Sequence, residues 1–191
     1  MKKSVITIVL FTIITLISNA QNLYTLDKNH TKVGFSATHF GISHVEGRFK
    51  NVSATFQAKK PDFTDAIIEV TIDVKSIDTD IEMRDNDLKG DTWFDVIKYP
   101  SITFKSTSFK KISEKNYKLE GNITIHGITK PIILDVIYNG KALNPMTKKS
   151  AVGFTITGKL NRNDFLVGTG GGNSVVGNEI EITSNAEFII D

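Results

Sequence analysis

The sequence predicts an all-β protein, an antiparallel sandwich or barrel of about eight strands. Apolar and polar residues alternate with a period of two along most of the chain from Leu23 onward. Turn-forming segments rich in Gly, Pro, Asn and Lys separate these alternating stretches. Because each strand has one apolar and one polar face, a single curved sheet with a solvated outer surface fits the pattern.

The beginning of the chain has the features of a signal peptide. Lys2 and Lys3 precede the uncharged apolar run Val5–Ile17, and Ser18 and Ala20 supply the small residues of a cleavage site. The apolar run is too short for a typical spanning helix, and no second run follows, although an uncleaved anchor is the alternative. We expect residues 1–20 to be removed on export and residues 21–191 to form one domain.

The composition of the mature chain points away from several classes of function. Two of the 23 Lys and Arg residues lie in the signal peptide, which leaves 21 basic residues against 21 acidic ones. This balance predicts no broad attraction to nucleic acid or to a membrane surface. The chain has no cysteine, which excludes disulfides, a thiolate nucleophile, a lipid anchor on cysteine and cysteine-based metal sites.

The first half of the domain predicts three strand regions. Alternation is regular in each, except near Gly47, where the phase is interrupted and a bend or bulge is expected. The regions are 31–39, with Val33, Phe35 and Ala37 on the apolar face, then 45–59, then 66–74, with Ile68, Val70, Ile72 and Val74 on the apolar face.

The second half predicts five more strands, several of them long. Residues 116–126 would span roughly 36 Å at about 3.3 Å per residue, whereas strands of globular proteins more often have about five or six residues. A barrel closed from such strands would be deep. The five regions are 101–109, 116–126, 131–139, 151–160 and 178–190.

The stretch Asp80–Asp95 is the one helical candidate. Asp78 or Thr79 can cap its start, and Gly90 lies where a helix commonly ends. Three large apolar residues in the same stretch need an apolar surface to cover, and the open end of a barrel would provide one. They are Leu88, Trp93 and Phe94.

The acidic residues of this stretch do not form a calcium loop. Asp85, Asp87 and Gly90 have the spacing of the first, third and sixth positions of an EF-hand. Lys89 then occupies the fifth position and Val96 the twelfth, where an oxygen ligand and a bidentate Glu are required. We therefore interpret these carboxylates as surface groups and expect no metal here.

The histidines leave a second class of function open. His39 and His44 flank a glycine bend, and His126 follows a predicted strand. None forms a known metal motif, but a composite site with carboxylates would make the protein metal-dependent or an enzyme. Nucleophile elbows and converging catalytic carboxylates are not evident, so no catalytic residue is assigned.

The predicted interior is rich in aromatic and aliphatic residues. An eight-stranded barrel can be filled by its side chains or can hold one small ligand, and periodicity does not decide between these cases. A deep apolar bore would suit a long apolar molecule, because each CH₂ group of a ligand that is buried contributes about 0.8 kcal/mol to the free energy of binding. Our candidate ligand-binding residues are Phe35, Phe40, Phe49, Arg84, Leu88, Trp93, Phe94, Phe104, Ile123, Ile125, Phe154 and Phe188.

Four segments in order resemble the YceI-like family of periplasmic polyisoprenoid-binding proteins. Within them, "SIDT", "RD", "FDV.KYP.I.F.S", "IHG.TKP" and "NR.DF" have the order and spacing of that family, from about Tyr24 to the end of the chain. The resemblance implies an elongated, lipocalin-like antiparallel barrel of eight strands, with a lipid in its apolar bore and a short helix near one end.

One departure from the family concerns the predicted helix. Relatives usually carry His where this chain has Asp87, and Phe where it has Trp93. If that His contacts a ligand head group, the contact differs here. A carboxylate disfavours a nearby phosphate unless Arg84 or Lys89 offsets it, so a quinone, a fatty amide or a fatty acid is as plausible as a prenyl phosphate.

We therefore expect an exported binding protein, not an enzyme, that holds a polyisoprenoid or similar amphiphile for transport, storage or scavenging. No cofactor, nucleic-acid partner or stable membrane insertion is expected. The periplasm is the expected compartment, with secretion second. The oligomeric state is open, with a dimer among the options. One alternative is the metal-dependent protein or enzyme with a His/carboxylate site. The other is a dry-cored interaction module, that is, a barrel whose core is packed without a cavity and which acts through its surface.

Overall fold

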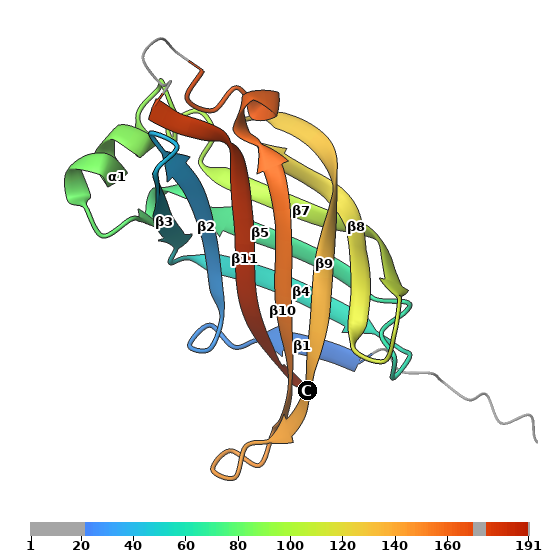
Figure 1. The fold of residues 1–191 in the computed structure, drawn as a ribbon. Coiled ribbons are helices and arrows are strands. Elements are labelled where there is room, and N and C mark those ends of the chain that lie inside the picture. The colour runs from blue at the N-terminus through green and yellow to red at the C-terminus, as the bar shows by residue number, and fades with distance from the viewer. Residues whose placement is uncertain (1–21, 170–174, 191) are drawn as a thin grey trace, which may run out of the picture.

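The computed structural model describes residues 22–169 and 175–190. Within them, eleven strands and one α-helix form an antiparallel barrel, which confirms the predicted all-β fold (Figure 1). The predicted signal peptide lies outside the described residues. No helix in the described part of the chain has the length and apolarity needed to cross a membrane.

Nine of the strands correspond to the regions that alternation predicts, with region 45–59 divided into β3 and β4, whereas β1 and β6 lie outside those regions. In chain order the elements are β1 (Asn22–Leu26), β2 (Lys32–His39), β3 (Ser43–Phe49), β4 (Val52–Ala58), β5 (Ile67–Asp73), η1 (Val74–Ser76), β6 (Ile77–Asp78), α1 (Glu82–Lys89), β7 (Ser101–Lys111), β8 (Asn116–Ile125), β9 (Ile128–Leu143), β10 (Ser150–Asn161), η2 (Arg162–Phe165) and β11 (Val176–Ile190).

Eight strands close the ring. They are hydrogen-bonded in the order β1, β4, β5, β7, β8, β9, β10 and β11, and β1 also pairs with β11. Residues 188–190 of β11 pair with β1, and residues 176–185 of β11 pair with β2. The strands β1 and β2 therefore lie end to end along β11. In the same way β3 pairs with β2 and β4 with β1. The phase break expected near Gly47 lies between Phe49 and Val52, where β3 ends and β4 begins.

A bulge lets one strand keep its apolar residues inside over its whole length. Phe104 and Phe109 of β7 are both buried, although a spacing of five would place them on opposite faces of a regular strand. The register of β7 against β8 shifts between Ser106 and Ser108, which restores the inward direction. Both rings therefore contribute to the interior.

Buried side chains form two clusters at opposite ends of the barrel. The first, which we call the aromatic end, is a set of rings in contact with one another. Tyr24 stacks on Phe56 with ring centroids 4.5 Å apart, and Phe109 stacks on Tyr117 at 4.8 Å. Phe63, from the loop between β4 and β5, packs its ring among them. The rings are Tyr24, Phe56, Phe63, Phe109, Tyr117, Tyr138, Phe154 and Phe188.

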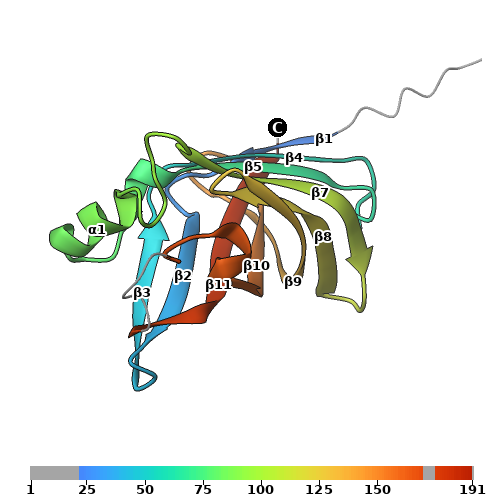
Figure 2. The same cartoon turned by 90° about the horizontal axis from the view of Figure 1, so that it is seen from above.

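The second cluster, which we call the mouth end, lies where α1, η2 and the loop after α1 gather (Figure 1). Figure 2 looks down on the barrel and shows α1 at one side, outside the ring of strands. The buried members of this cluster are mostly aliphatic: Phe49, Val74, Ile77, Val96, Ile102, Ile125, Phe165 and Val167.

The helix is present, but the predicted caps are wrong. Its N-cap is Ile81, whose side chain makes no capping hydrogen bond. Asp78 is instead engaged by Arg48, and Thr79 by Asp85, so neither is available to the helix start. Gly90 does end the helix, but with an ordinary negative φ of −67° instead of a left-handed one.

Candidate functional site

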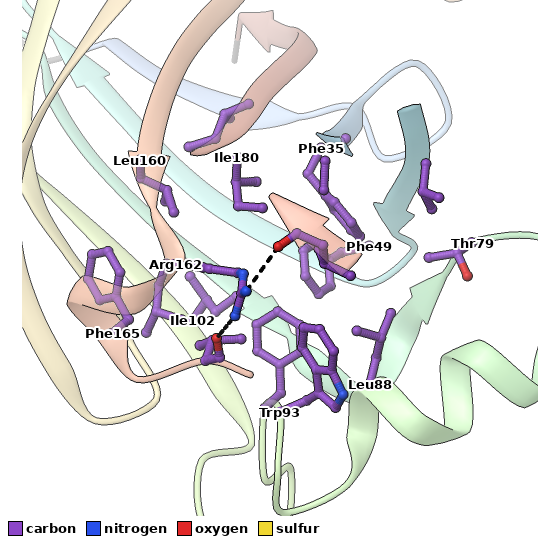
Figure 3. Close-up of a pocket in the computed structure, with 18 of the residues that line it drawn as sticks. Phe35, Phe49, Thr79, Leu88, Trp93, Ile102, Leu160, Arg162, Phe165 and Ile180 are labelled. Carbon is purple, nitrogen blue, oxygen red and sulfur yellow. Dashed lines mark hydrogen bonds between the residues drawn. The ribbon is translucent and has the colours of Figure 1, made fainter. Parts of the chain in front are cut away.

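The mouth end encloses a cavity of about 380 Å³, which we call the mouth cavity (Figure 3). It lies between α1, the loop after it, η2 and the inner faces of the strands. Its wall is mostly aliphatic and aromatic, as Figure 3 shows for Phe35, Phe49, Ile102, Leu160 and Ile180. The polar side chains of its wall are Thr38, His39, Thr79, Arg84, Asp87 and Arg162.

A second cavity of about 150 Å³, the inner cavity, extends the interior toward the aromatic end. Its polar lining residues are Thr31 and Ser184, and the remaining wall is apolar. Four residues line both cavities, so the two adjoin inside the same barrel. They are Val33, Ile72, Ile123 and Ile182. The interior of this barrel is therefore not completely filled by its own side chains.

Eleven of the twelve candidate residues line these cavities. In the mouth cavity they are Phe35, Phe49, Arg84, Leu88, Trp93, Phe94, Ile123 and Ile125, and in the inner cavity Phe104, Phe154 and Phe188, together with Ile123 again. They come from β2, β3, β7, β8, β10 and β11 and from the segment around α1. That they contact a ligand stays a prediction.

Phe40 is the candidate that lies outside. It follows β2 with a φ of 52°, and 63% of its surface is exposed. This left-handed conformation turns its ring out of the strand's alternation and onto the ring of His39, with centroids 4.3 Å apart.

A buried network holds Arg84 at the cavity wall. Asp85 accepts hydrogen bonds from the backbone N–H of Thr79 at 2.8 Å and from its hydroxyl at 2.5 Å. The same hydroxyl accepts from Nε of Arg84 at 2.8 Å, and Nη2 of Arg84 donates to the Thr79 carbonyl at 2.5 Å. Asp85 and Thr79 are 8% and 2% exposed, so the network is fixed in a site of low polarity.

Asp87 shows where the mouth cavity meets the surface. It is on the same helix, it is exposed, and it also lines the cavity. The position at which the family resemblance implied a His therefore does face the cavity. Together with Arg84 it places one negative and one positive group at the same opening.

Arg162 is a functional candidate that the sequence reasoning missed. It begins η2, is 5% exposed and lines the mouth cavity. Its guanidinium donates to the backbone carbonyls of Gly177, Val167, Gly168 and Val176 at 2.7–3.1 Å.

The same guanidinium packs on an aromatic ring. Cζ of Arg162 lies 5.6 Å from the centroid of the Trp93 ring. Figure 3 shows the two side chains next to each other. Burial lowers the pKa of Arg162 below its ordinary value, but a guanidinium keeps its charge in proteins. The "NR.DF" segment contained this residue but gave no indication of its role.

The three histidines considered from the sequence do not converge on carboxylates in the described residues. Nδ1 of His126 lies 3.2 Å from the Phe165 carbonyl, and its ring packs on Tyr99. In residues 22–169 and 175–190, the group whose atoms are close enough for one metal ion is a different one, Asp27, His30 and Glu187.

Comparison with curated proteins finds relatives that match most of the chain. A UPF0312 protein of Pseudomonas savastanoi is 37% identical over 146 residues, which are 74% of this chain and 74% of that protein. The protein YceI of Salmonella arizonae is 35% identical over 148 residues, 76% of each chain.

Solved structures share the fold. BcnA of Burkholderia cenocepacia has a TM-score of 0.76 at 26% identity, over 85% of this chain and 98% of that one. A YceI protein of Campylobacter jejuni has a TM-score of 0.71 at 35% identity, over 87% and 96%. A polyisoprenoid binding domain of Saccharophagus degradans, implicated in plant cell wall breakdown, has a TM-score of 0.65 over 88% and 98%, and its 14% identity shows likeness of fold alone.

The sequence model of one protein family, the YceI-like domain, matches residues 24–188, which are almost all of the described barrel. Together with the relatives above, it shows that this chain belongs to the YceI-like family.

Proposed function

We propose that this protein is an exported carrier that holds one long-chain lipid, an isoprenoid or a similar amphiphile, in the bore of its barrel. The observation that carries the proposal is the apolar interior formed by the two adjoining cavities. The mouth cavity of about 380 Å³ is within the usual range of ligand sites, and such sites are mostly apolar with few polar groups.

The distribution of polar groups supports one orientation of the ligand. Charged and histidine side chains line the mouth cavity, whereas the inner cavity has two hydroxyls as its polar side chains. An apolar tail would extend past Ile123 toward the aromatic end, and a head group would remain beside Arg84 and Asp87. Burial of the tail would supply most of the affinity, about 0.8 kcal/mol for each CH₂.

The head group is the finer part of the proposal. Arg84 favours an anionic or polar acceptor group, and Asp87 at the same opening disfavours a second negative charge. The fold neighbour from Saccharophagus degradans, a polyisoprenoid binding domain, makes an isoprenoid tail the first choice. A neutral head such as a quinone suits this mixed opening as well as a prenyl phosphate does.

The test is extraction of lipid from the purified protein, followed by mass spectrometry. The wild type should carry lipid in a near-stoichiometric amount. Ile123→Trp, which fills the wall shared by the two cavities, should carry much less or a shorter chain. Ile133→Trp is the matched control, because Ile133 is exposed on β9 and lines neither cavity.

Two results would contradict the carrier function. One is wild-type protein that contains no lipid and does not bind a hydrophobic dye. The other is equal lipid content in the two tryptophan variants.

Export is tested separately, by cell fractionation and by the mass of the recovered protein. We expect a periplasmic chain that begins at Gln21, because Ser18 and Ala20 are the small residues of the proposed cleavage site. A full-length chain in the cytoplasm would refute export without affecting lipid binding.

A further inference from the structure

We propose that Asp27, His30 and Glu187 form a binding site for a divalent transition-metal ion, with Zn²⁺ as the best fit, at the seam where the barrel closes. The possible ligand atoms of these three residues all lie within 4.8 Å of one another. The site is separate from the mouth cavity and uses none of its lining residues.

The location is the interruption between β1 and β2. These strands lie end to end along β11, and the loop between them joins the lower end of β2 to β1 (Figure 1, blue). Asp27 and His30 belong to this loop, and Glu187 belongs to β11 on the other side of the seam. A metal ion here would connect the first strands of the barrel to the last.

The backbone already holds the three residues in place. The N–H of Asp27 donates to the Glu187 carbonyl at 2.8 Å, and the N–H of Glu187 donates to the hydroxyl of Thr31 at 3.2 Å. Within the loop, the Asn29 N–H donates to Oδ1 of Asp27 at 2.9 Å. Only side-chain torsions of exposed or half-buried groups need to change for an ion to bind.

The charges favour a cation. Asp27 and Glu187 bring two carboxylates together, and in the described residues neither has an ion pair with Lys or Arg. His30 completes the group, because its Nδ1 lies 2.9 Å from Oδ2 of Asp27. A neutral imidazole nitrogen at this place can bind a cation together with the two carboxylates.

The ligand set and geometry select the ion. One imidazole and two carboxylates suit Zn²⁺ and its neighbours, whereas Ca²⁺ and Mg²⁺ prefer oxygen ligands alone. Zn²⁺ bonds of about 2.0–2.2 Å put tetrahedral ligands roughly 3.3 Å apart. The Asp27–His30 pair must open slightly, and Glu187 must approach. Three protein ligands leave a fourth position for water, so the affinity is lower than that of a closed structural site.

The first experiment is calorimetric titration of the full protein, free of any affinity tag, with Zn²⁺. We expect one ion bound for each chain, little response to Mg²⁺, and a rise in melting temperature on binding. His30→Gln and Glu187→Gln should each weaken binding by at least about tenfold, since removal even of supporting groups has effects of 10–100-fold. Both residues are outside the buried core, so the variants should fold.

The matched control is His44→Gln, which removes an exposed histidine of β3 that lies outside the seam and lines neither cavity. It should bind Zn²⁺ as the wild type does. Loss of binding in this variant, retention of binding in both seam variants, or no binding by the wild type would each overturn the proposal. All three outcomes are independent of whether the protein carries lipid.

Discussion

The aromatic end and the mouth end of the barrel are built from the same alternating strands but are stabilised in different ways. At the aromatic end, inward side chains are large rings that contact one another and leave a small cavity of about 150 Å³. At the mouth end, the inward residues are mostly aliphatic and enclose about 380 Å³. Hydrogen bonds and ion pairs of Arg84, Arg162 and Arg48 support that end.

The difference separates stability from binding within one β-barrel. The packed rings of the aromatic end stabilise the fold without a ligand and leave little room beside them, whereas the mouth end keeps more apolar surface available to a ligand. Substitutions at the aromatic end should therefore change mainly the free energy of unfolding. Substitutions at the mouth end should change mainly ligand content.

The largest expected effect is at the aromatic end. Phe56→Ala removes a ring that is 1% exposed and touches Tyr24, Phe63, Phe154 and Phe188, and it should cost about 3–5 kcal/mol. Urea denaturation would measure the loss.

The comparison variant is Phe35→Ala, from the half-buried wall of the mouth cavity. It should lose less stability than Phe56→Ala but more bound lipid. If the two variants lose stability and lipid in the same proportion, the division between the two ends is wrong.

A smaller effect is expected from Thr79→Val, which keeps the shape of the side chain but removes the hydroxyl between Asp85 and Arg84. Leaving the buried Asp85 with fewer donors should cost about 1–3 kcal/mol. Release of Arg84 should also change the preference for head groups. Thr79→Ser retains the hydroxyl and should behave as the wild type in both denaturation and lipid analysis; equal behaviour of the two variants would refute the role of the network.

The smallest effect concerns pH and the junction of β3 with β6. Hydrogen bonds from Arg48, the N–H of Asp80 and the ammonium of Lys50 lower the pKa of Asp78 from 3.8 to about 2. Because the folded pKa is depressed, this stabilisation is complete above about pH 4 and is lost as the pH falls toward 2.

The urea midpoint of unfolding should therefore be higher for the wild type than for Asp78→Asn. The difference between the two midpoints should be constant from pH 7 to about pH 5 and should decrease below about pH 4. Asp91→Asn, a change at an exposed carboxylate, provides the control and should show no such trend. A margin that stays constant down to pH 2 would mean that the ion pair does not stabilise the junction.

The strand pattern predicted most of the interior because a period of two assigns each residue to a face. Phe35, Phe104, Phe154 and Phe188 line cavities for this reason. Alternation assigns the inward face of each strand separately, so the prediction did not require knowledge of which strands are neighbours. Ile123, on the wall between the two cavities, was found in the same way.

The residues that alternation misplaced or missed lie outside regular strands. Phe40 points away because of its positive φ, and Phe63, also with a positive φ of 60°, closes the aromatic end from a loop. Arg162 acts through backbone carbonyls of a distant segment, which no local pattern indicates. The helix cap was misassigned because Asp78 has its partner thirty residues away in Arg48.

The seam has a consequence for how the chain folds. Tyr24 pairs with Ile190, so the ring is completed by the strands that are farthest apart in the sequence. Such non-local pairing gives a high contact order, and barrels of this kind fold in milliseconds to seconds, more slowly than local topologies. Because this pairing closes the ring, a chain in which β1 and β11 have not yet paired would leave the apolar interior open along the seam. Under the proposed carrier function, a lipid could then be enclosed as the seam closes, without passing through the finished mouth.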